Sequence, residues 1–489
     1  MSPDLNASSP LLWARFRFSL VGSLLSAPPR KGELKPALEA LAEKTWTHPV
    51  TGEPVKYARM SIERWYYVAR RSKDDPVGAL RRAIRKDSGT QVAMTEPFRI
   101  ALLGLYKAHR GWTVKLLYDN LCVLVAEDAA LGSTPSYSTV LRFTRAHGLL
   151  RQRRGRNADR PGAQRAQERL DSREVRSYEA EYVGSLWHLD FHVSSLKVLT
   201  ADGAWVKPVV LGILDDHSRL ACHVQWYLSE TAEDLVHGLS QAFQKRGLPR
   251  AALMDNGAAM LAEEVKQGLL RLGVIQETTF PYSPYQNGKQ ESFWGPLEGR
   301  LLAMLEGVKD LTLALLQEAT QAWVELEYNR TPHSETDEKP LDRFLKGPDV
   351  LRPSPSSDAL RDAFRQETVR TQRKSDGTVS LESVRFEVPN RFRHLERITV
   401  RYARWNLRSV HLVDERTGTV LSPLYPEDKA ENADSRRRVL EPSILSEAPR
   451  AEPGADGMAP LLRKLLREYA ATGIPPAYLP KAEGKEVEG

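Results

Sequence analysis

The chain has 489 residues, of which 41% are hydrophobic and 27% charged, and its formal net charge is +7. This composition is typical of a folded soluble protein, and no stretch approaches the roughly 20 apolar residues that cross a bilayer. The length predicts about three or four domains. Its two cysteines, Cys122 and Cys222, lack metal-ligand spacing. A disulfide framework or a cysteine zinc site is therefore excluded, and a reducing compartment is expected.

Residues 1–88 are expected to form a first DNA-binding domain. The stretches FRFSLVGSLLS and ELKPALEALAEKTW carry apolar residues at helical spacing, and THPVTGEPVKY indicates a turn or a small β-wing. The basic, aromatic stretch SIERWYYVARR follows. Two helices, a wing and a basic helix predict a helix-turn-helix unit, in which Arg64, Arg70 and Arg71 would contact DNA.

Residues 89–156 repeat this pattern. Three helical stretches, EPFRIALLGLYKAHRG, TVKLLYDNLCVLVAEDA and SYSTVLRFTRAHGLL, lead directly into the basic run RQRRGR. A second helix-turn-helix domain is predicted, because a basic flank after a helical module favours DNA binding. Its expected DNA contacts are Arg142, Arg145, Arg151, Arg153, Arg154 and Arg156. The alternatives are two helical bundles without a DNA role and a solvated linker for the basic run.

Residues 157–180 are polar and predict a linker, and residues 181–347 change in character. The stretches SLWHLDFHVSSLKVL, WVKPVVLGILDD and ACHVQWYL are apolar and rich in β-formers. The helical TAEDLVHGLSQAFQKRG, the strand RAALMD, the helical LAEEVKQGLLRLG and the strand VIQETTF follow. Strands first, then alternating strands and helices, predict an α/β domain with a mixed sheet covered by helices.

Residues 360–425 alternate apolar and polar positions around DG and TG turns, which predicts a small SH3-like β-barrel. In ERITVRYARW, Arg397 and Arg401 alternate with Ile398, Val400 and Tyr402. We expect one buried face and one basic face, and the basic face would contact the DNA backbone.

Residues 426–457 are rich in Pro, Glu, Ala and Arg and are expected to be disordered. The helical stretch at 458–480 has one apolar face, which suits a docking helix that binds a partner protein. A helix packed on its own chain is the alternative. The apolar face consists of Leu461, Leu462, Leu465, Leu466 and Tyr469.

Three acidic residues stand out in the central region. Asp190 lies within the first apolar strand, Asp255 ends a short buried strand, and Glu291 begins a helix. A charged residue inside a buried strand is costly unless it is compensated, and a divalent cation compensates several converging carboxylates. Asp255 and Glu291 also have structural interpretations, since Asp255 could begin a turn and Glu291 could stabilise a helix start. His188 shares a strand face with Asp190 and is expected to be a packed core histidine, with a place near a metal as the alternative.

The ordered motifs LDFH, MDNG and PYSPYQNGKQESFW resemble the core of DDE integrases and transposases, which has an RNase H-like fold. Asp255 and Glu291 are 36 positions apart, so 35 residues lie between them, a spacing that many members of the family keep. ILDDHSRL resembles the second and third strands of the family with their turn, and Asp215 and Asp216 within it are interpreted as structural. YNRTPHSETDEKPLDRF resembles the end of the core, so the resemblance covers about residues 180–345. The flanking modules are similar to those of phage Mu-type and related transposases.

The resemblance implies a polynucleotidyl transferase in which Asp190, Asp255 and Glu291 hold two Mg²⁺ ions, with Mn²⁺ as a substitute. Such an enzyme would cut transposon ends to free a 3′-OH and would join that 3′-OH to target DNA. Lys289, which lies two residues before Glu291, would contact the DNA end or lie in solvent.

The resemblance also implies partners: double-stranded DNA at both transposon ends and target, further copies of the chain on DNA, and an AAA+ ATPase that selects the target. A cytoplasmic, nucleoid-associated bacterial protein is expected. Three alternatives stay open: a DNA-binding regulator, a catalytically inactive transposase-derived subunit, and a retroviral-type integrase that acts without an ATPase.

Overall fold

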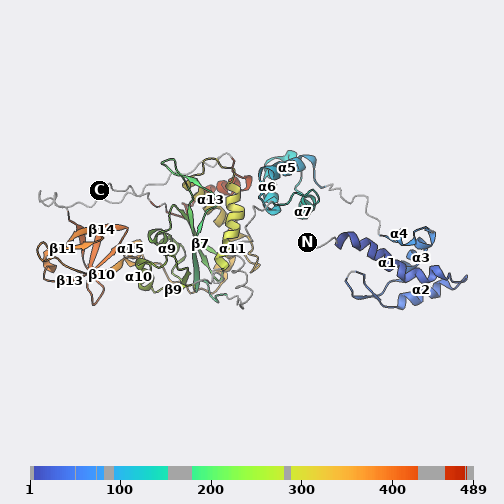
Figure 1. The fold of residues 1–489 in the computed structure, drawn as a ribbon, viewed down its shortest axis with the longest axis horizontal. Helices are drawn as coiled ribbons and strands as arrows, with labels where there is room; N and C mark the ends of the chain where they lie inside the picture. The colour runs from blue at the N-terminus through green and yellow to red at the C-terminus, as the bar shows by residue number, and fades with distance from the viewer. Residues whose placement is uncertain are drawn as a thin grey trace, which may run out of the picture. The chain divides into compact units, whose positions relative to one another are not determined.

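The computed structural model of the chain describes residues 5–49, 51–72, 74–81, 93–151, 179–279, 288–427, 457–479 and 481. The chain divides into two compact units, Met1–Val92 and Ala93–Gly489. Figure 1 colours the elements from blue at the N-terminus to red at the C-terminus. The predicted linker and the predicted disordered segment lie almost wholly outside the described residues, as does the loop at 280–287.

The first unit is a helical domain with a short hairpin. The expected turn or wing is a two-stranded antiparallel hairpin in which Trp46 pairs with Val55. Ile62 and Tyr66 of the basic helix are buried against Leu20 and Leu38, so one face of that helix belongs to the core. The described elements are α1 (Leu5–Ser26), α2 (Leu34–Glu43), β1 (Trp46–Thr47), β2 (Pro54–Val55), α3 (Arg59–Arg71) and α4 (Pro76–Ala79).

The second helical group begins the second unit. Thr95, Thr113 and Ser136 each cap a helix by accepting a hydrogen bond from a backbone N–H three residues later. Trp112 donates its indole N–H to the carbonyl of Ala303 at 3.0 Å, so this group packs on the central domain. The elements are α5 (Glu96–Ala108), α6 (Val114–Glu127), the 3₁₀ helix η1 (Ala129–Leu131) and α7 (Tyr137–Ala146).

The central domain contains the predicted mixed sheet, with strand order β7-β6-β3-β8-β9. β3 lies in the middle, antiparallel to β6 and parallel to β8. In this register Asp190 pairs with Gly212 of β6, and His188 pairs with Leu253 of β8. The strands are β3 (Leu186–Val193), β6 (Val209–Asp215), β7 (Ala221–Tyr227), β8 (Ala251–Met254) and β9 (Ile275–Thr278), with a separate hairpin of β4 (Val198–Leu199) and β5 (Trp205–Val206).

Helices cover both faces of this sheet, as the sequence predicts. α9 and α10 pack on the face that carries Trp187 and Leu189, and the helices around α11 and α13 pack on the other face. Figure 1 shows β7 between α9 and α13, both of which contact it. The helices are α9 (Ala232–Arg246), α10 (Glu263–Arg271), α11 (Gly288–Pro296), the π-helix η3 (Leu297–Leu302), α12 (Ala303–Leu305), α13 (Leu313–Leu326), the 3₁₀ helix η4 (Tyr328–Arg330), α14 (Pro340–Lys346) and α15 (Ser357–Ala363).

A C-terminal six-stranded antiparallel sheet follows, with order β10-β13-β14-β15-β12-β11. A bridge between Arg373 and Thr378 links the two outer strands, so the sheet nearly closes into a barrel around Phe386 and Val400. This confirms the expected barrel-like unit. The elements are β10 (Gln366–Thr371), β11 (Thr378–Leu381), β12 (Val384–Glu387), the 3₁₀ helix η5 (Asn390–Phe392), β13 (Arg397–Ala403), β14 (Asn406–Val413) and β15 (Val420–Pro426).

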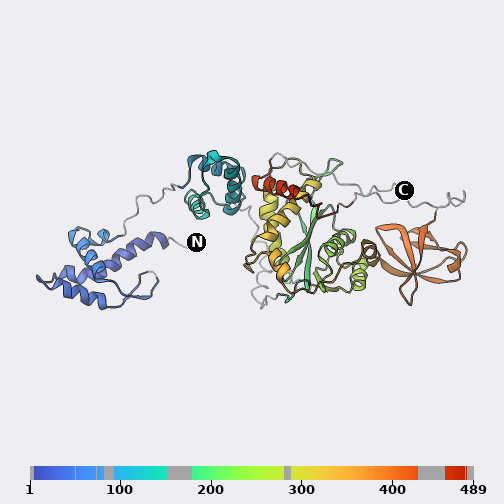
Figure 2. The ribbon, with the colours of Figure 1, turned by 180° about the vertical axis from the view of Figure 1, so that it is seen from behind.

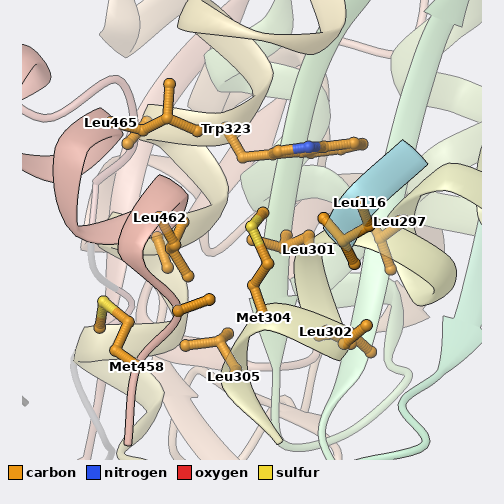
Figure 3. Packing of buried hydrophobic residues seen from close by; sticks show 14 of the residues in the cluster. Leu116, Leu297, Leu301, Leu302, Met304, Leu305, Trp323, Met458, Leu462 and Leu465 are labelled. Carbon is orange, nitrogen blue, oxygen red and sulfur yellow. The ribbon is translucent and has the colours of Figure 1, made fainter. Parts of the chain in front are cut away.

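The last helix, α17 (Pro460–Ala471), returns to the central domain and contacts α13 and α6. Figure 2 shows it in red beside the yellow helices. Leu462 and Leu465 point into the same apolar cluster as Leu297 and Leu301 of η3 (Figure 3). The helix therefore shares one core with the segment that continues α11.

Candidate active site

Asp190 lies in the centre of the sheet, on the face of β3 that α11 covers. The indole N–H of Trp294, on α11, donates a hydrogen bond to Oδ2 of Asp190 at 3.0 Å. Burial raises the pKa of the Asp190 carboxyl to about 6, the Trp294 hydrogen bond opposes this rise, and the charge of Asp255 adds to it. Asp190 is thus a half-buried acid that accepts a hydrogen bond from Trp294 and lies near a second acid.

Asp255 follows β8 directly. Because β3 and β8 are parallel and His188 pairs with Leu253, Asp190 and Asp255 come two residues later on neighbouring strands. The charge of Asp255 contributes to the raised pKa of Asp190, which agrees with this proximity of the two carboxyl groups. Oδ1 of Asp255 accepts the backbone N–H of Gly257 at 2.9 Å, the turn contact that its sequence context suggested. The turn and a role in the site are therefore compatible.

A further acid, Glu230, lies beside Asp255 and was not singled out from the sequence. Burial and the Asp255 charge raise the pKa of its carboxyl. It follows β7 just before the N-cap of α9, where an acidic residue has an ordinary local explanation. Only the sheet topology could have pointed to Glu230, because β7 and β8 run in the same direction and end at the same edge of the sheet.

Glu291 is placed differently from the two aspartates. It lies in the first turn of α11 with an exposed side chain, while Gln290, Phe293 and Trp294 of the same helix are buried. Among the described residues, no group of three or more His, Cys, Asp or Glu side chains is arranged to hold a metal ion. The structure therefore places the carboxyl groups of Asp190 and Asp255 near each other, and Glu291 is an exposed residue of the first turn of α11.

α11 approaches the sheet closely at Gly212. The amide N–H of Gln290 donates to the Gly212 carbonyl at 3.2 Å. A Cβ on Gly212 would lie 2.5 Å from Nε2 of Gln290 and 2.6 Å from a ring carbon of Trp294. Glycine is therefore required at the position opposite Asp190 if α11 is to dock there. Sequence reasoning missed Trp294 as a site residue, although Trp294 lies one helical turn after Glu291.

A second network lies beside Asp190. The imidazole of His192 stacks on Trp294, with ring centroids 5.1 Å apart, and its Nε2 lies 3.0 Å from Oε1 of Glu298. Ser195 donates both its backbone N–H and its hydroxyl to Glu298. Burial would raise the pKa of Glu298, but His192 and Ser195 lower it below its ordinary value. This network fixes the ring of Trp294 from its far side.

The two acids of the β6–β7 turn are buried and hydrogen-bonded, in agreement with their structural interpretation. Asp215 accepts the N–H groups of Gly184 and Ser218, both at 2.8 Å, and the Ser218 hydroxyl at 2.6 Å. Asp216 lies 2.6 Å from Nε2 of His188, which is the packed core histidine that was expected. Lys289 forms an ion pair with Asp216, so its side chain is neither free in solvent nor placed by the structure on a DNA end.

The arginines expected to contact DNA have mixed placements. Those on the two helical groups are exposed: Arg64, Arg70, Arg71, Arg142, Arg145 and Arg151. Arg153, Arg154 and Arg156 lie outside the described residues. On β13, Arg397 is exposed, but Arg401 is 7% exposed and pairs with Asp362 at 2.9 Å and with Glu367 at 2.7 Å. The expected basic face of β13 is corrected there, because acidic side chains from α15 and β10 cover Arg401.

The apolar face of α17 lies on the chain itself, which was the alternative to docking on a partner. Leu462, Leu465 and Leu466 are buried, and Leu461 and Tyr469 are partly buried. The face meets residues of α6, η3 and α13 (Figure 3). A partner that used these leucines would first have to displace the helix.

Residues 180–284 match the family model described as "Integrase core domain". The central part of the chain therefore has an RNase H-like core of the DDE integrase and transposase type, the class that the sequence motifs predicted. An integrase core domain suggests a polynucleotidyl transferase. No helix among the described residues has the length and apolar character required to span a membrane.

The chain also resembles solved viral structures. The magnesium complex of the HTLV-2 integrase catalytic core domain, in a trimeric form, is 16% identical with a TM-score of 0.27, and the match covers 35% of this chain and 99% of that one. The BIV integrase catalytic core domain is 21% identical with a TM-score of 0.27, over 33% and 95%. A simian T-cell lymphotropic virus intasome, in complex with PP2A regulatory subunit B56 gamma, is 13% identical with a TM-score of 0.30, over 63% and 96%.

Proposed function

We propose that the chain is a Mu-type DNA transposase that binds transposon ends, cuts them to free a 3′-OH and joins that 3′-OH to target DNA. The observation that carries the proposal is the pair of Asp190 and Asp255 on adjacent central strands of an integrase core domain. Two neighbouring carboxyl groups, one of them half-buried with a raised pKa, are costly in a purely structural core. Such a pair supports a site of chemistry.

The donor set of this pair fits a divalent cation. Carboxylate oxygens are the ligands that Mg²⁺ and Mn²⁺ prefer, and a cation would offset the repulsion between Asp190 and Asp255. Glu291 would complete the set from α11, because Trp294, three residues further along that helix, already contacts Asp190. Two bound Mg²⁺ ions supply activation of the attacking oxygen and stabilisation of the leaving oxygen in phosphoryl transfer.

The side chains of the chain prepare this site. Asp190 must lose its proton before it can bind a cation, so its raised pKa makes loading of the site favourable above about pH 6. Trp294 holds Oδ2 of Asp190 and thereby fixes the orientation of the carboxylate. α11 must present Glu291 to the same place, and its close approach at Gly212 supports this.

DNA is the proposed ligand of the exposed arginines on the two helical groups. Arg64 and Arg71 lie exposed on α3, whose opposite face is in the core, and Arg142 and Arg145 lie exposed on α7. Exposed arginines on one face of a helix suit contacts with phosphates and base edges. Pairing of two transposon ends would require at least two copies of the chain on DNA.

The proposal of an AAA+ ATPase partner is based on the resemblance to Mu-type transposases. Since the apolar face of α17 is in the core, a partner would bind its exposed basic face, which carries Arg463, Lys464 and Arg467. Charge reversal at Arg463 and Lys464 should spare DNA cleavage and reduce ATPase-dependent target joining. Normal joining in that variant would remove the ATPase from the proposal and favour a retroviral-type integrase.

Strand transfer with purified protein, terminal DNA and Mg²⁺ tests the function. Asp190→Asn, Asp255→Asn and Glu291→Gln should each lower the rate by at least about 10³-fold. Asp310→Asn, at an exposed position, should not change it. Wild-type rates in the three acid variants would refute the proposal. Binding of DNA without cutting by the unmodified protein would indicate a regulator or an inactive subunit.

A further inference from the structure

One buried carboxylate joins three separate parts of the central domain. Asp216 follows β6, and its side chain is 0% exposed. It accepts the backbone N–H of Ala180 at 2.6 Å, lies 2.6 Å from Nε2 of His188, and forms an ion pair with Nζ of Lys289. These donors come from the segment before β3, from β3 itself and from α11.

The charge of Asp216 makes these contacts obligatory. Burial would raise the pKa of its carboxyl, but the hydrogen bonds from His188, Lys289 and the Ala180 N–H hold it well below its usual value. The guanidinium of Arg219 adds a positive charge 3.9 Å away. A buried ionised group that loses a partner is strongly unfavourable. The ion pair therefore resists any movement of α11 that would carry Lys289 away.

The two side chains that Asp216 holds are next to two of the three acids. His188 lies two residues before Asp190 on the same face of β3, and Lys289 lies two residues before Glu291 on α11. Asp216 thus connects the strand of one acid directly to the helix of another.

The same helix has two further contacts with the sheet. Gln290 donates to the Gly212 carbonyl at 3.2 Å, and Trp294 donates to Asp190 at 3.0 Å. The Trp294 contact lies one turn further along α11, whereas Lys289 and Gln290 both hold the first turn, where Glu291 is. Of these three contacts, the ion pair with Asp216 is closest in sequence to the start of the helix.

We propose that Asp216 is a positioning residue, which holds the first turn of α11 through Lys289 so that Glu291 can reach Asp190 and Asp255. The proposal deepens the proposed function and rests on it for the role of Glu291. The structural role that the sequence suggested for Asp216 becomes a specific one, because the residue sets the place of the third acid. Its neighbour Asp215 instead accepts hydrogen bonds from Gly184 and Ser218, which lie outside α11.

The test compares Asp216→Asn and Lys289→Met with the matched control Asp215→Asn, which alters an adjacent and equally buried acid. Hydrogen–deuterium exchange of the full chain without metal reports on α11 directly. We expect amide exchange in residues 288–296 to accelerate about tenfold or more in the first two variants, and to be unchanged in Asp215→Asn. The affinity for Mn²⁺, measured by calorimetry, should fall about tenfold or more in the same two variants.

Lys289→Met decides the test if Asp216→Asn does not fold, because Lys289 lies at the edge of the cluster with 14% of its side chain exposed. Unchanged exchange in α11 of Lys289→Met would overturn the proposal. Equal acceleration in Asp215→Asn would also overturn it, since any damage to the turn would then act alike. These readouts are independent of strand transfer, so a protein without transferase activity would refute the proposed function and not the positioning role.

Discussion

The two aspartates and the glutamate of the candidate site are held by different means. Asp190 lies on β3 and Asp255 directly follows β8, and the parallel pairing of these two strands, which ends at His188 and Leu253, fixes where both acids lie. Glu291 lies on a helix whose place depends on side-chain contacts with Asp216, Gly212 and Asp190. The two aspartates lie near each other in the structure, and Glu291 is exposed on α11. The sheet fixes the positions of acids at its strands before any ligand binds. The position of an acid on a docked helix depends on the side-chain contacts that hold the helix against the sheet.

Lengthening or shortening each acid by one methylene would sharpen this comparison most strongly. Asp190→Glu should reduce strand transfer by at least about 10³-fold, because β3 cannot shift to accommodate a longer side chain. Glu291→Asp should cost less, about 10–100-fold, since α11 can adjust. Single-turnover strand-transfer rates measure both. Equal losses would show that the helix is as rigidly placed as the strands.

A substitution in α17 can weaken the apolar core that holds α11 and its continuation η3. Leu462 of α17 is fully buried in the cluster that contains η3, the continuation of α11 (Figure 3). Leu462→Ala should lower the free energy of unfolding by about 2–5 kcal/mol. Denaturant unfolding measures this, with Lys464→Ala on the exposed face as a control that should stay within about 0.5 kcal/mol. An unchanged free energy of unfolding in Leu462→Ala would mean that α17 does not stabilise this core.

The close approach of α11 to β6 can be blocked with one methyl group. Gly212→Ala places a Cβ against the Trp294 ring and should cost about 1–3 kcal/mol of stability. Strand transfer should fall more than this loss of folded protein explains, because α11 is pushed from Asp190. Gly295→Ala is the matched control in the same helix: nothing lies within 4 Å of its Cβ, and it should stabilise by up to about 1 kcal/mol. Similar melting temperatures for both variants would contradict the close docking.

The smallest expected effect concerns the charge of Asp190 in metal-free protein. Its folded-state pKa of about 6 lies above the ordinary value of 3.8, so the folded state binds the proton more tightly than the unfolded state. This contribution to stability is present below about pH 4 and is lost as the pH rises through about 6. Asp190→Asn should therefore be about 1–3 kcal/mol more stable than the unmodified protein at pH 8, and nearly equal to it at pH 4.

Thermal unfolding in EDTA between pH 4 and pH 8 measures this difference, and Asp310→Asn serves as the exposed control. Addition of Mg²⁺ at pH 8 should stabilise the unmodified protein and not Asp190→Asn, because only the former keeps the charge that binds the ion. A difference that does not change with pH would place the Asp190 pKa near its ordinary value.

The sequence predicted the sheet and its helices well, because apolar runs and alternating patterns report directly on strands and amphipathic helices. It also predicted the neighbourhood of Asp190 and Asp255, since both end up at the same end of parallel strands. It did not predict the contacts of Gly212, Gln290 and Trp294, which depend on how closely a helix docks on a strand about 80 residues earlier. Spacing along the chain carries no information about that distance.

Arg401 shows a second limit of sequence reasoning. The alternation along β13 indicated a polar outer face, and Arg401 does lie opposite the barrel core. Asp362 from α15 and Glu367 from β10 then cover that face and pair with the guanidinium. Strand periodicity predicts which side chains point away from the core of a sheet. It does not predict whether another element of the chain covers those side chains.

The anchoring of the second helical group on the central domain has a consequence for where DNA would be cut. Trp112 bonds to Ala303, Arg300 pairs with Asp119 at 2.9 Å, and the N–H of Leu461 binds Asn120 at 2.9 Å. α7 is therefore held at a set distance from Asp190. A DNA duplex bound by the arginines of α7 would present one defined face of its helix to the acidic residues. Inserting about five base pairs, half a turn of B-DNA, between the bound sequence and the cleavage point would present the wrong strand to the carboxylates. The protein would therefore cut DNA at a fixed number of base pairs from the sequence that it binds.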